Sequence, residues 1–300
     1  MKNFITKKAN KLVTHNGSFH ADDIFACAAL CLLLEKKGEK FEIIRTRDPK
    51  IIEAGDYAFD IGSIYDEKTN RFDHHQKGGA GGREGVEYSS FGLVWKKFGA
   101  ELCESEKAAE IIDKKLVAPV DAFDNGMDLV QNKYEITPYY IQHLFFSMRP
   151  TWKEADLSKD QMFLECVKIA KVVLTREIVQ VRDALLADDL VIANYKKSAD
   201  KRIIILDDKY PFDALHDFPE PLFVIYPRVI TSDWGVEAVR DNPKTFKNRK
   251  SLPEAWAGLR EEELQKVTGV PDAIFCHRGL YLAVAKTKLG AIALAQKALS

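Results

Sequence analysis

Short apolar runs alternate with longer helical patterns over the first half of the chain. The run KLVTHN at residues 11–16 precedes a helical pattern at residues 22–37, and FEIIRTRD, DYAFDIGS and NRFDHHQ read as further strands. Helical patterns return at FGLVWKKFG and over residues 107–120. Because strands that alternate with helices at this spacing are typical of βαβ units, the sequence predicts an α/β domain with a mainly parallel sheet.

A long pattern without glycine or proline occupies residues 157–187. Its apolar residues recur at intervals of three and four, which predicts one long helix that links two domains. Beyond it, RIIILDD, PLFVIYPRV, WGVEAVR and GLYLAVAKT read as strands, and KLGAIALAQKAL reads as a C-terminal helix. We therefore expect an α/β domain at residues 1–150, a linking helix at 151–188, and a smaller α+β domain at 189–300.

The bulk composition is that of an ordinary globular chain, with 46% hydrophobic and 30% charged residues. The net charge of −1 excludes a protein that holds nucleic acid by bulk positive charge, so any such contact requires a local basic groove. The five cysteines are scattered and form no C-x-x-C pair. Their distribution favours free thiols in a reducing compartment over a zinc ribbon or a disulfide framework.

The N-terminal sequence and the apolar runs bear on localisation. The first ten residues are too short and too polar for a secretory signal. No apolar stretch approaches the ~18–20 residues that a membrane span requires. The expectation is a cytoplasmic protein that does not associate with a membrane.

Histidine and aspartate residues gather in clusters, mostly where a predicted strand ends. The clusters are His15 and His20 with Asp22 and Asp23, Asp60 alone, the triplet Asp73-His74-His75, and Asp121 with Asp124. Since the carboxyl ends of parallel strands share the edge of a sheet where ligands bind, we expect the clusters to converge. Imidazoles mixed with carboxylates, without a thiolate, favour manganese, with magnesium as the alternative, over a structural zinc.

The number of candidate ligands in these clusters is sufficient for two ions. Two ions roughly 3.5–4 Å apart can share a carboxylate, generate hydroxide and clamp the oxygens of an in-line phosphoryl displacement. The sequence therefore predicts a hydrolase of phosphate esters that depends on two divalent metal ions.

Several of these motifs resemble the DHH phosphoesterase superfamily, namely the triplet at residues 73–75, Asp60 after its strand, and the opening HNGSFHADD. The phrases THNGSFHADD, DIGSIYD, FDHHQKGG, YSSFGLVW and VDAFDNG resemble one branch more closely, the melanocyte-proliferating-gene-one (MYG-one) exonucleases. The C-terminal WAGLREEELQKVTGVPDAIFCHRGLYLAVAKT resembles the same branch, so the resemblance covers nearly the whole chain. It implies a DHH-type catalytic domain, a C-terminal substrate-binding domain and a 3′–5′ exonuclease that acts on RNA.

The resemblance also implies roles for particular residues. The implied metal ligands are His15, His20, Asp22, Asp60 and His74, with either Asp121 or Asp124. Asp60 would bridge the ions, His75 would face the substrate phosphate, and Asp73 would orient a neighbouring side chain. In the C-terminal domain, Arg260 and His277 would bind the substrate.

The opening motif departs from the superfamily pattern at one position. Many members have Asp-x-Asp where this chain has His20-Ala-Asp22, which replaces an anionic ligand with a neutral one and lowers the charge of the site. Asp23 offers a compensating carboxylate, but its place at the start of a helix favours a capping role. The sequence leaves the choice between these two roles open.

Two other functions fit the same motifs. One is the hydrolysis of small phosphate compounds, such as pyrophosphate, short oligonucleotides or cyclic dinucleotides. The other is a non-catalytic module that binds nucleic acid and retains the metals, against which the intact set of His and Asp residues argues. The favoured substrate is single-stranded RNA or an oligonucleotide, and the sequence leaves open whether the chain forms a homodimer.

Overall fold

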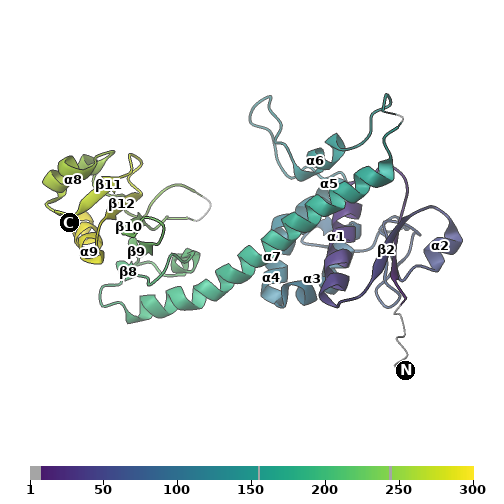
Figure 1. The fold of residues 1–300 in the computed structure, drawn as a ribbon, viewed down its shortest axis with the longest axis horizontal. Coiled ribbons are helices and arrows are strands. Elements are labelled where there is room, and N and C mark those ends of the chain that lie inside the picture. Colours follow the sequence, from purple (N-terminus) through teal and green to yellow (C-terminus); the bar gives the residue numbers. More distant parts are fainter. Residues whose placement is uncertain (1–7, 155, 243–244) are drawn as a thin grey trace, which may run out of the picture. The chain divides into compact units, whose positions relative to one another are not determined.

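The computed structural model describes residues 8–154, 156–242 and 245–300. The chain divides into two compact units, Met1–Arg182 and Asp183–Ser300, each with its own sheet (Figure 1). Within the described residues, no helix is both long and apolar enough to cross a lipid bilayer.

The first unit is built around a mainly parallel sheet. Its strands are β1 (Asn10–Thr14), β2 (Phe41–Arg45), β3 (Tyr57–Phe59), β4 (Tyr65–Asp66) and β5 (Arg71–Phe72). Their order is β2-β1-β3-β5-β4, with parallel pairing throughout except between β4 and β5, which form an antiparallel hairpin before the triplet at residues 73–75. The prediction of a mixed α/β fold with parallel strand pairs is confirmed.

Helices and a short hairpin complete the first unit. The helical segments are α1 (Ala21–Lys36), α2 (Pro49–Glu53), α3 (Ser90–Cys103), α4 (Glu106–Ile112), the π-helical η1 (Asp113–Val117), α5 (Ala118–Asp124) and α6 (Ile141–Ser147). The hairpin is formed by β6 (Gly82–Arg83) and β7 (Val86–Glu87). The sequence predicted one helical pattern over residues 107–120, and the structure divides it among α4, η1 and α5.

The helix α1 is apolar on nearly all sides, a pattern typical of a helix enclosed by other elements. The ring of Phe25 stacks on Phe91 of α3, with ring centroids 5.1 Å apart. Because α1 follows β1 after a short turn, its enclosure holds the buried carboxylates of Asp22 and Asp23 close to the end of that strand.

The second unit is an α+β structure around a mainly antiparallel sheet. Its strands are β8 (Ile203–Ile205), β9 (Phe223–Arg228), β10 (Asp233–Ala238), β11 (Ala273–Cys276) and β12 (Leu282–Ala285). Its helical segments are the 3₁₀ turns η2 (Asp213–Asp217) and η3 (Glu254–Trp256), α8 (Glu261–Thr268) and α9 (Lys288–Leu299). The strand order is β11-β12-β10-β9-β8, and β8 pairs with β9 in parallel.

Both faces of the second sheet are covered by apolar clusters. Phe223 and Ile225 of β9 belong to one cluster, whereas the intervening Val224 and Tyr226 belong to the other. This division follows the two-residue period of a strand. The strand β11 was not among the predicted strands; it is four residues long, and its pairing with β12 shows an irregularity in register.

The helix α7 (Lys159–Lys197) begins within the segment expected to be helical and extends beyond its predicted end. Val191 is buried in the apolar cluster that contains Val224 and Tyr226, and Tyr195 packs against that cluster. Ala187, Val191 and Tyr195 thus continue the four-residue apolar spacing beyond the predicted end of the helix. The limit between the two compact units falls inside this helix, after Arg182. The domain limits expected from the sequence at residues 150 and 188 stay predictions.

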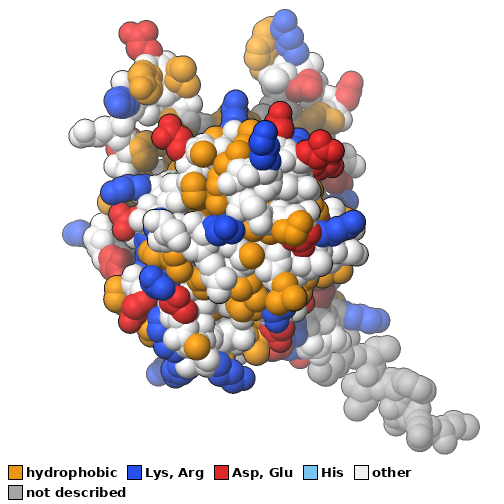
Figure 2. All heavy atoms as spheres, turned by 90° about the vertical axis from the view of Figure 1, so that its left-hand side faces the viewer, with side chains coloured by type: hydrophobic (Ala, Val, Ile, Leu, Met, Phe, Trp, Pro, Cys, Tyr) orange, Lys and Arg blue, Asp and Glu red, His pale blue; other side chains and the backbone are white. Residues whose placement is uncertain are grey.

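Figure 2 shows Lys and Arg side chains interspersed with Asp and Glu on the visible face, with hydrophobic side chains among them. This mixture agrees with a net charge of −1. It differs from the basic stripe typical of proteins that hold nucleic acid by bulk charge. This face therefore gives no indication of binding nucleic acid by bulk positive charge.

Candidate metal centre

A cavity of about 960 Å³ lies in the first unit, where several of its strands end. His15 follows β1, Asp60 follows β3, and the triplet at residues 73–75 follows β5, and all of them line the cavity. The other lining residues predicted from the sequence are His20, Asp22 and Asp124. The structure thus brings together these clusters from four segments of the chain at the edge of the sheet where parallel strands present their carboxyl ends.

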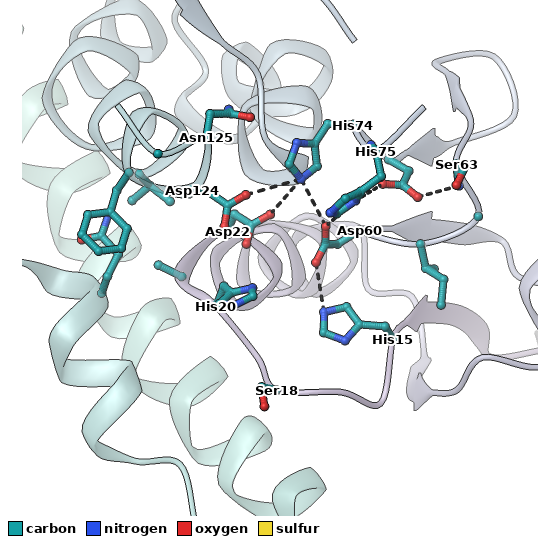
Figure 3. A pocket seen from close by; sticks show the side chains of 18 of the residues that line it. His15, Ser18, His20, Asp22, Asp60, Ser63, His74, His75, Asp124 and Asn125 are labelled. Atoms are coloured by element: carbon teal, nitrogen blue, oxygen red, sulfur yellow. Dashed lines mark hydrogen bonds and ion pairs between the residues drawn. The ribbon is translucent and has the colours of Figure 1, made fainter. Parts of the chain in front are cut away.

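Asp60 occupies the middle of this arrangement (Figure 3). Its Oδ2 lies 3.0 Å from His15 Nε2, and its Oδ1 lies 3.4 Å from His74 Nε2 and 3.5 Å from His75 Nδ1. Burial alone would raise the pKa of Asp60, but the adjacent imidazoles of His15 and His74 lower it below its usual range. The side chain is therefore a carboxylate with imidazoles on both of its oxygens.

A second group of ligand atoms lies on the other side of His74. The ligand atoms of His20, Asp22 and Asp124 lie within 4.8 Å of one another. His74 Nε2 lies 3.4 Å from Asp124 Oδ2 and 3.9 Å from Asp22 Oδ2. Burial, together with the nearby carboxylates of Asp60 and Asp124, raises the pKa of Asp22 well above its usual range.

The donor atoms of this cluster fit a divalent cation. Among the described residues, Asp22 Oδ1, Asp60 Oδ1 and His74 Nε2 are buried without a hydrogen-bond partner. Buried polar atoms ordinarily have such a partner, and a cation bound between them would satisfy all three. Carboxylate oxygens with imidazole nitrogens and no thiolate form a donor set that manganese and magnesium accept.

The carboxylates of Asp23, which is outside the cavity lining, and of Asp73, which belongs to it, contact neighbouring candidate residues. Asp23 Oδ1 accepts a hydrogen bond from the His20 backbone N–H at 2.9 Å, and its Oδ2 lies 3.2 Å from His15 Nε2. It therefore caps α1 and also contacts one of the candidate ligands. Asp73 Oδ1 lies 2.8 Å from His75 Nδ1, a contact typical of a carboxylate that orients a neighbouring imidazole.

The two aspartates that the sequence left as alternatives have different surroundings. Asp124 lines the cavity, whereas Asp121 is fully buried away from it. Asp121 accepts hydrogen bonds from Arg83 at 2.7 Å, from the Ser89 hydroxyl at 2.5 Å and from the Gly92 N–H at 3.0 Å. A Cβ atom at Gly92 would lie 2.0 Å from Asp121 Oδ2, so only glycine fits at that point of α3. Asp121 thus ties α5 to α3 and to the hairpin.

We expect Asp121→Ala to destabilise the first unit by about 3 kcal/mol, because it leaves buried hydrogen-bond donors of Arg83, Ser89 and Gly92 without an acceptor. Urea unfolding followed by circular dichroism measures this change, with the exposed Asp128→Ala as the matched control. An Asp121→Ala protein with an unchanged midpoint but weaker metal binding would contradict the structural role.

Arg47 also lines the cavity, and sequence reasoning missed it. The residue is exposed, and within the described part of the chain its guanidinium has no carboxylate partner. The sequence contained a signal for it, since Arg47 comes two residues after the strand FEIIR and therefore lies at the same edge of the sheet as the histidines.

The two residues of the second unit that were predicted to bind substrate, Arg260 and His277, both lie beside the ring of Phe275. The guanidinium of Arg260 lies 4.6 Å from the ring centroid of Phe275, whose ring is 6.2 Å from that of His277. His277 Nδ1 accepts a hydrogen bond from the Gly279 N–H at 2.9 Å. The structure brings Arg260 and His277 together within the second unit, and their role in substrate binding stays a prediction.

Comparisons with known proteins cover most of the chain. The family described as Uncharacterised protein family (UPF0160), whose model carries the name MYG1 exonuclease, matches residues 11–299. The human protein named MYG1 exonuclease is 29% identical over 97% of this chain and 86% of its own length. The MYG1 protein of Schizosaccharomyces pombe is 30% identical over 96% of this chain and 97% of its own length.

A crystal structure of exonuclease RecJ bound to manganese also matches, with 12% identity over 97% of this chain and 89% of that one. The TM-score is 0.26. A likeness this weak does not establish a shared fold.

Proposed function

Because the chain belongs to the MYG1 exonuclease family (UPF0160), we propose that it is a metal-dependent exonuclease that hydrolyses RNA from the 3′ end. The observation that carries the proposal is the position of Asp60. Its carboxylate faces His15 on one oxygen and His74 on the other, inside a cavity where buried ligand atoms lack hydrogen-bond partners. Such a carboxylate is suited to bridge two cations.

The proposed centre holds two divalent ions, with manganese favoured and magnesium as the alternative. The residues that would hold them are His15, His20, Asp22, Asp60, His74 and Asp124. When bound, such ions lower the pKa of a coordinated water and stabilise the charge of a phosphoryl group under attack. Of the two aspartates, Asp124 is the proposed ligand; its place in the cavity lining, and the hydrogen bonds that hold Asp121 elsewhere, support this choice.

The protein side chains around the centre would position the substrate phosphate. His75 lines the cavity, and its contact with Asp73 through Nδ1 leaves Nε2 for a phosphate oxygen. Arg47 offers a planar guanidinium that matches a phosphate in a bidentate manner. Together they supply hydrogen-bond donors in a cavity whose lining also contains the carboxylates of Asp22, Asp60, Asp73 and Asp124.

We extend the proposal to the organisation of the chain. Residues 1–150 would form a DHH-type catalytic domain, with the triplet Asp73-His74-His75 at the end of β5. Residues 151–188, which contain most of α7, would link this domain to residues 189–300, which would bind substrate through Arg260 and His277. The grouping of these two side chains around Phe275 supports a common role.

The decisive experiment is hydrolysis of a 5′-labelled single-stranded RNA of about twenty nucleotides by the full chain with manganese, since a two-metal centre requires its ions for turnover. A ladder that shortens from the 3′ end and disappears with EDTA is the expected result. Release of the labelled nucleotide at the start of the reaction would instead show hydrolysis from the 5′ end. Inert RNA with rapid hydrolysis of pyrophosphate would identify a hydrolase of small phosphates, and metal-independent binding without turnover would identify a binding module.

Replacing Arg47 with alanine is expected to lower kcat/KM for RNA by about 10- to 150-fold, the equivalent of one charged hydrogen bond. Most of the change should appear in KM, because contact with a phosphate away from the scissile bond stabilises bound substrate and transition state alike. Steady-state kinetics measures both constants, with Arg202→Ala, at an exposed ion pair with Asp200, as the control. Equal kinetics for the two variants would exclude Arg47 from substrate binding.

A further inference from the structure

A series of rings leads from the cavity to solvent along α6 and the segment before it. Phe146 lines the cavity, with its ring centroid 6.1 Å from that of His20 and 6.4 Å from that of His143. The ring of His143 lies 5.4 Å from that of Tyr139, whose side chain is 69% exposed. We call Phe146, His143 and Tyr139 the ring series.

The inner end of the ring series belongs to the wall of the cavity next to the candidate ligands. Phe123 also lines the cavity, and its ring lies 6.1 Å from Phe146 and 5.9 Å from His143. It directly precedes the candidate ligand Asp124 in α5. A group held at the metal centre therefore lies next to the aromatic rings of the cavity wall, and further rings follow outward.

A positive charge accompanies the inner end of the series. The guanidinium of Arg149 lies 4.0 Å from the ring centroid of Phe146. It is fixed there because its Nε donates a hydrogen bond to the Phe19 carbonyl oxygen at 2.9 Å. Arginine beside aromatic rings is a combination that proteins use to bind single-stranded nucleic acid, where bases stack on the rings and the cation attracts the backbone.

We propose that the ring series binds the bases of the substrate strand, with the terminal base near Phe146 and the preceding bases directed toward Tyr139. This inference rests on the proposed function, since the series begins at the candidate metal centre. Stacked nucleotides repeat about every 3.4 Å along a strand, and each ring-to-ring step is 5.4 Å or 6.4 Å. The series is thus long enough for more than one nucleotide, and it favours unpaired bases because paired bases already stack on each other.

A second copy of this chain is the rival occupant of the same surface. The segment before α6 exposes aliphatic side chains, among them Leu129, Val130 and Ile136. These residues alone would suit a protein partner. The continuity of the ring series with the cavity wall, and the arginine on its inner ring, favour nucleic acid instead.

The test compares Tyr139→Ala with Tyr134→Ala in the full chain. Both tyrosines lie on the same segment and are equally exposed, at 69% and 70%, but Tyr134 is outside the ring series. Each variant is given a single-stranded RNA and a strand of the same length whose last nucleotides at the 3′ end lack bases. The measured quantity is the ratio of kcat/KM for the two strands with manganese, and the ratio of their binding constants with EDTA.

The expected result is a preference of the unmodified protein for the strand with bases, which Tyr139→Ala reduces by about 5- to 150-fold, the range of one base–aromatic stack. Tyr139→Trp should restore the preference, and Tyr134→Ala should retain it. If all variants hydrolyse RNA with the same preference for the strand with bases, the inference is wrong and the proposed function stands. Absence of hydrolysis would refute the proposed function, and the binding ratio would then decide the inference by itself.

Self-association is measured on the same proteins by analytical ultracentrifugation. If Tyr139→Ala converts a dimer to a monomer and keeps the preference for bases, the segment joins two copies of the chain and the inference is wrong. An unchanged mass with a reduced preference supports the base-binding role.

Discussion

Asp60→Asn is expected to reduce manganese-dependent hydrolysis by roughly 10³-fold or more, because the metal supplies several kcal/mol of charge stabilisation in the transition state. Asparagine has the shape of aspartate but no negative charge, so it is a poor bridge between two cations. Asp60 also has a left-handed backbone, with φ +54°. Asparagine enters that region as readily as aspartate does, and the fold should therefore be retained.

The measurement is single-turnover hydrolysis of the labelled RNA, with circular dichroism to show that each protein is folded. The exposed Asp128→Asn is the matched control, since it removes one carboxylate from the same unit at a residue that is not part of the cavity lining. If Asp60→Asn keeps more than a tenth of the rate, Asp60 is not a metal bridge and the proposed mechanism is wrong.

Removal of divalent ions with EDTA is expected to abolish turnover and lower Tm, and manganese should reverse both effects. The physical reason is the repulsion among the buried carboxylates of Asp22, Asp60 and Asp124, which a cation relieves. A ligand at 100 times its Kd adds about 2.7 kcal/mol to the stability of the folded state. For a unit of this size that corresponds to a shift in Tm of roughly 5–10 °C.

Manganese and protons compete for the same ligand atoms, so the affinity for manganese is expected to depend on pH. Burial alone would lower the pKa of His15, but its hydrogen bonds to Asp23 and Asp60 raise it to about 9. A metal ligand must be deprotonated, so below pH 9 the cation has to displace a proton from this imidazole. Manganese affinity should therefore rise as the pH increases toward 9. Calorimetry in two buffers of different ionisation enthalpy measures the released protons.

The Asp60→Asn protein provides the control for the thermal shift. It lacks the proposed bridge, so manganese should raise its Tm by much less than that of the unmodified chain. Equal shifts in the two proteins would show that manganese binds elsewhere.

Much of the candidate site could be predicted from the local pattern of apolar and polar residues. The alternation of short apolar runs with helices predicted parallel strands, and parallel strands present their carboxyl ends at one edge. His15, Asp60 and His74 each directly follow such a run or lie one residue beyond it, so their convergence required no knowledge of packing. The family likewise followed from motifs spread over nearly the whole chain.

Other parts of the site depend on contacts between segments that are distant in the sequence. Asp121 and Asp124 lie in the same short helix, and both are acidic. The position of Arg83 and the absence of a side chain at Gly92 decide that Asp121 is a structural anchor. These contacts span more than twenty-five residues of sequence, and no local periodicity encodes them.

The sequence by itself determined the family, the residue types that gather at the candidate site and the mixed α/β fold with parallel strand pairs, because motifs and apolar periodicity are local properties. Tertiary structure alone decided which of these residues face the cavity, that Asp23 both caps α1 and contacts His15, and that Arg47 and the ring series stand beside them. The reason is that the orientation of a side chain depends on how α1, α5 and α6 pack around the sheet, and packing is a property of the whole unit.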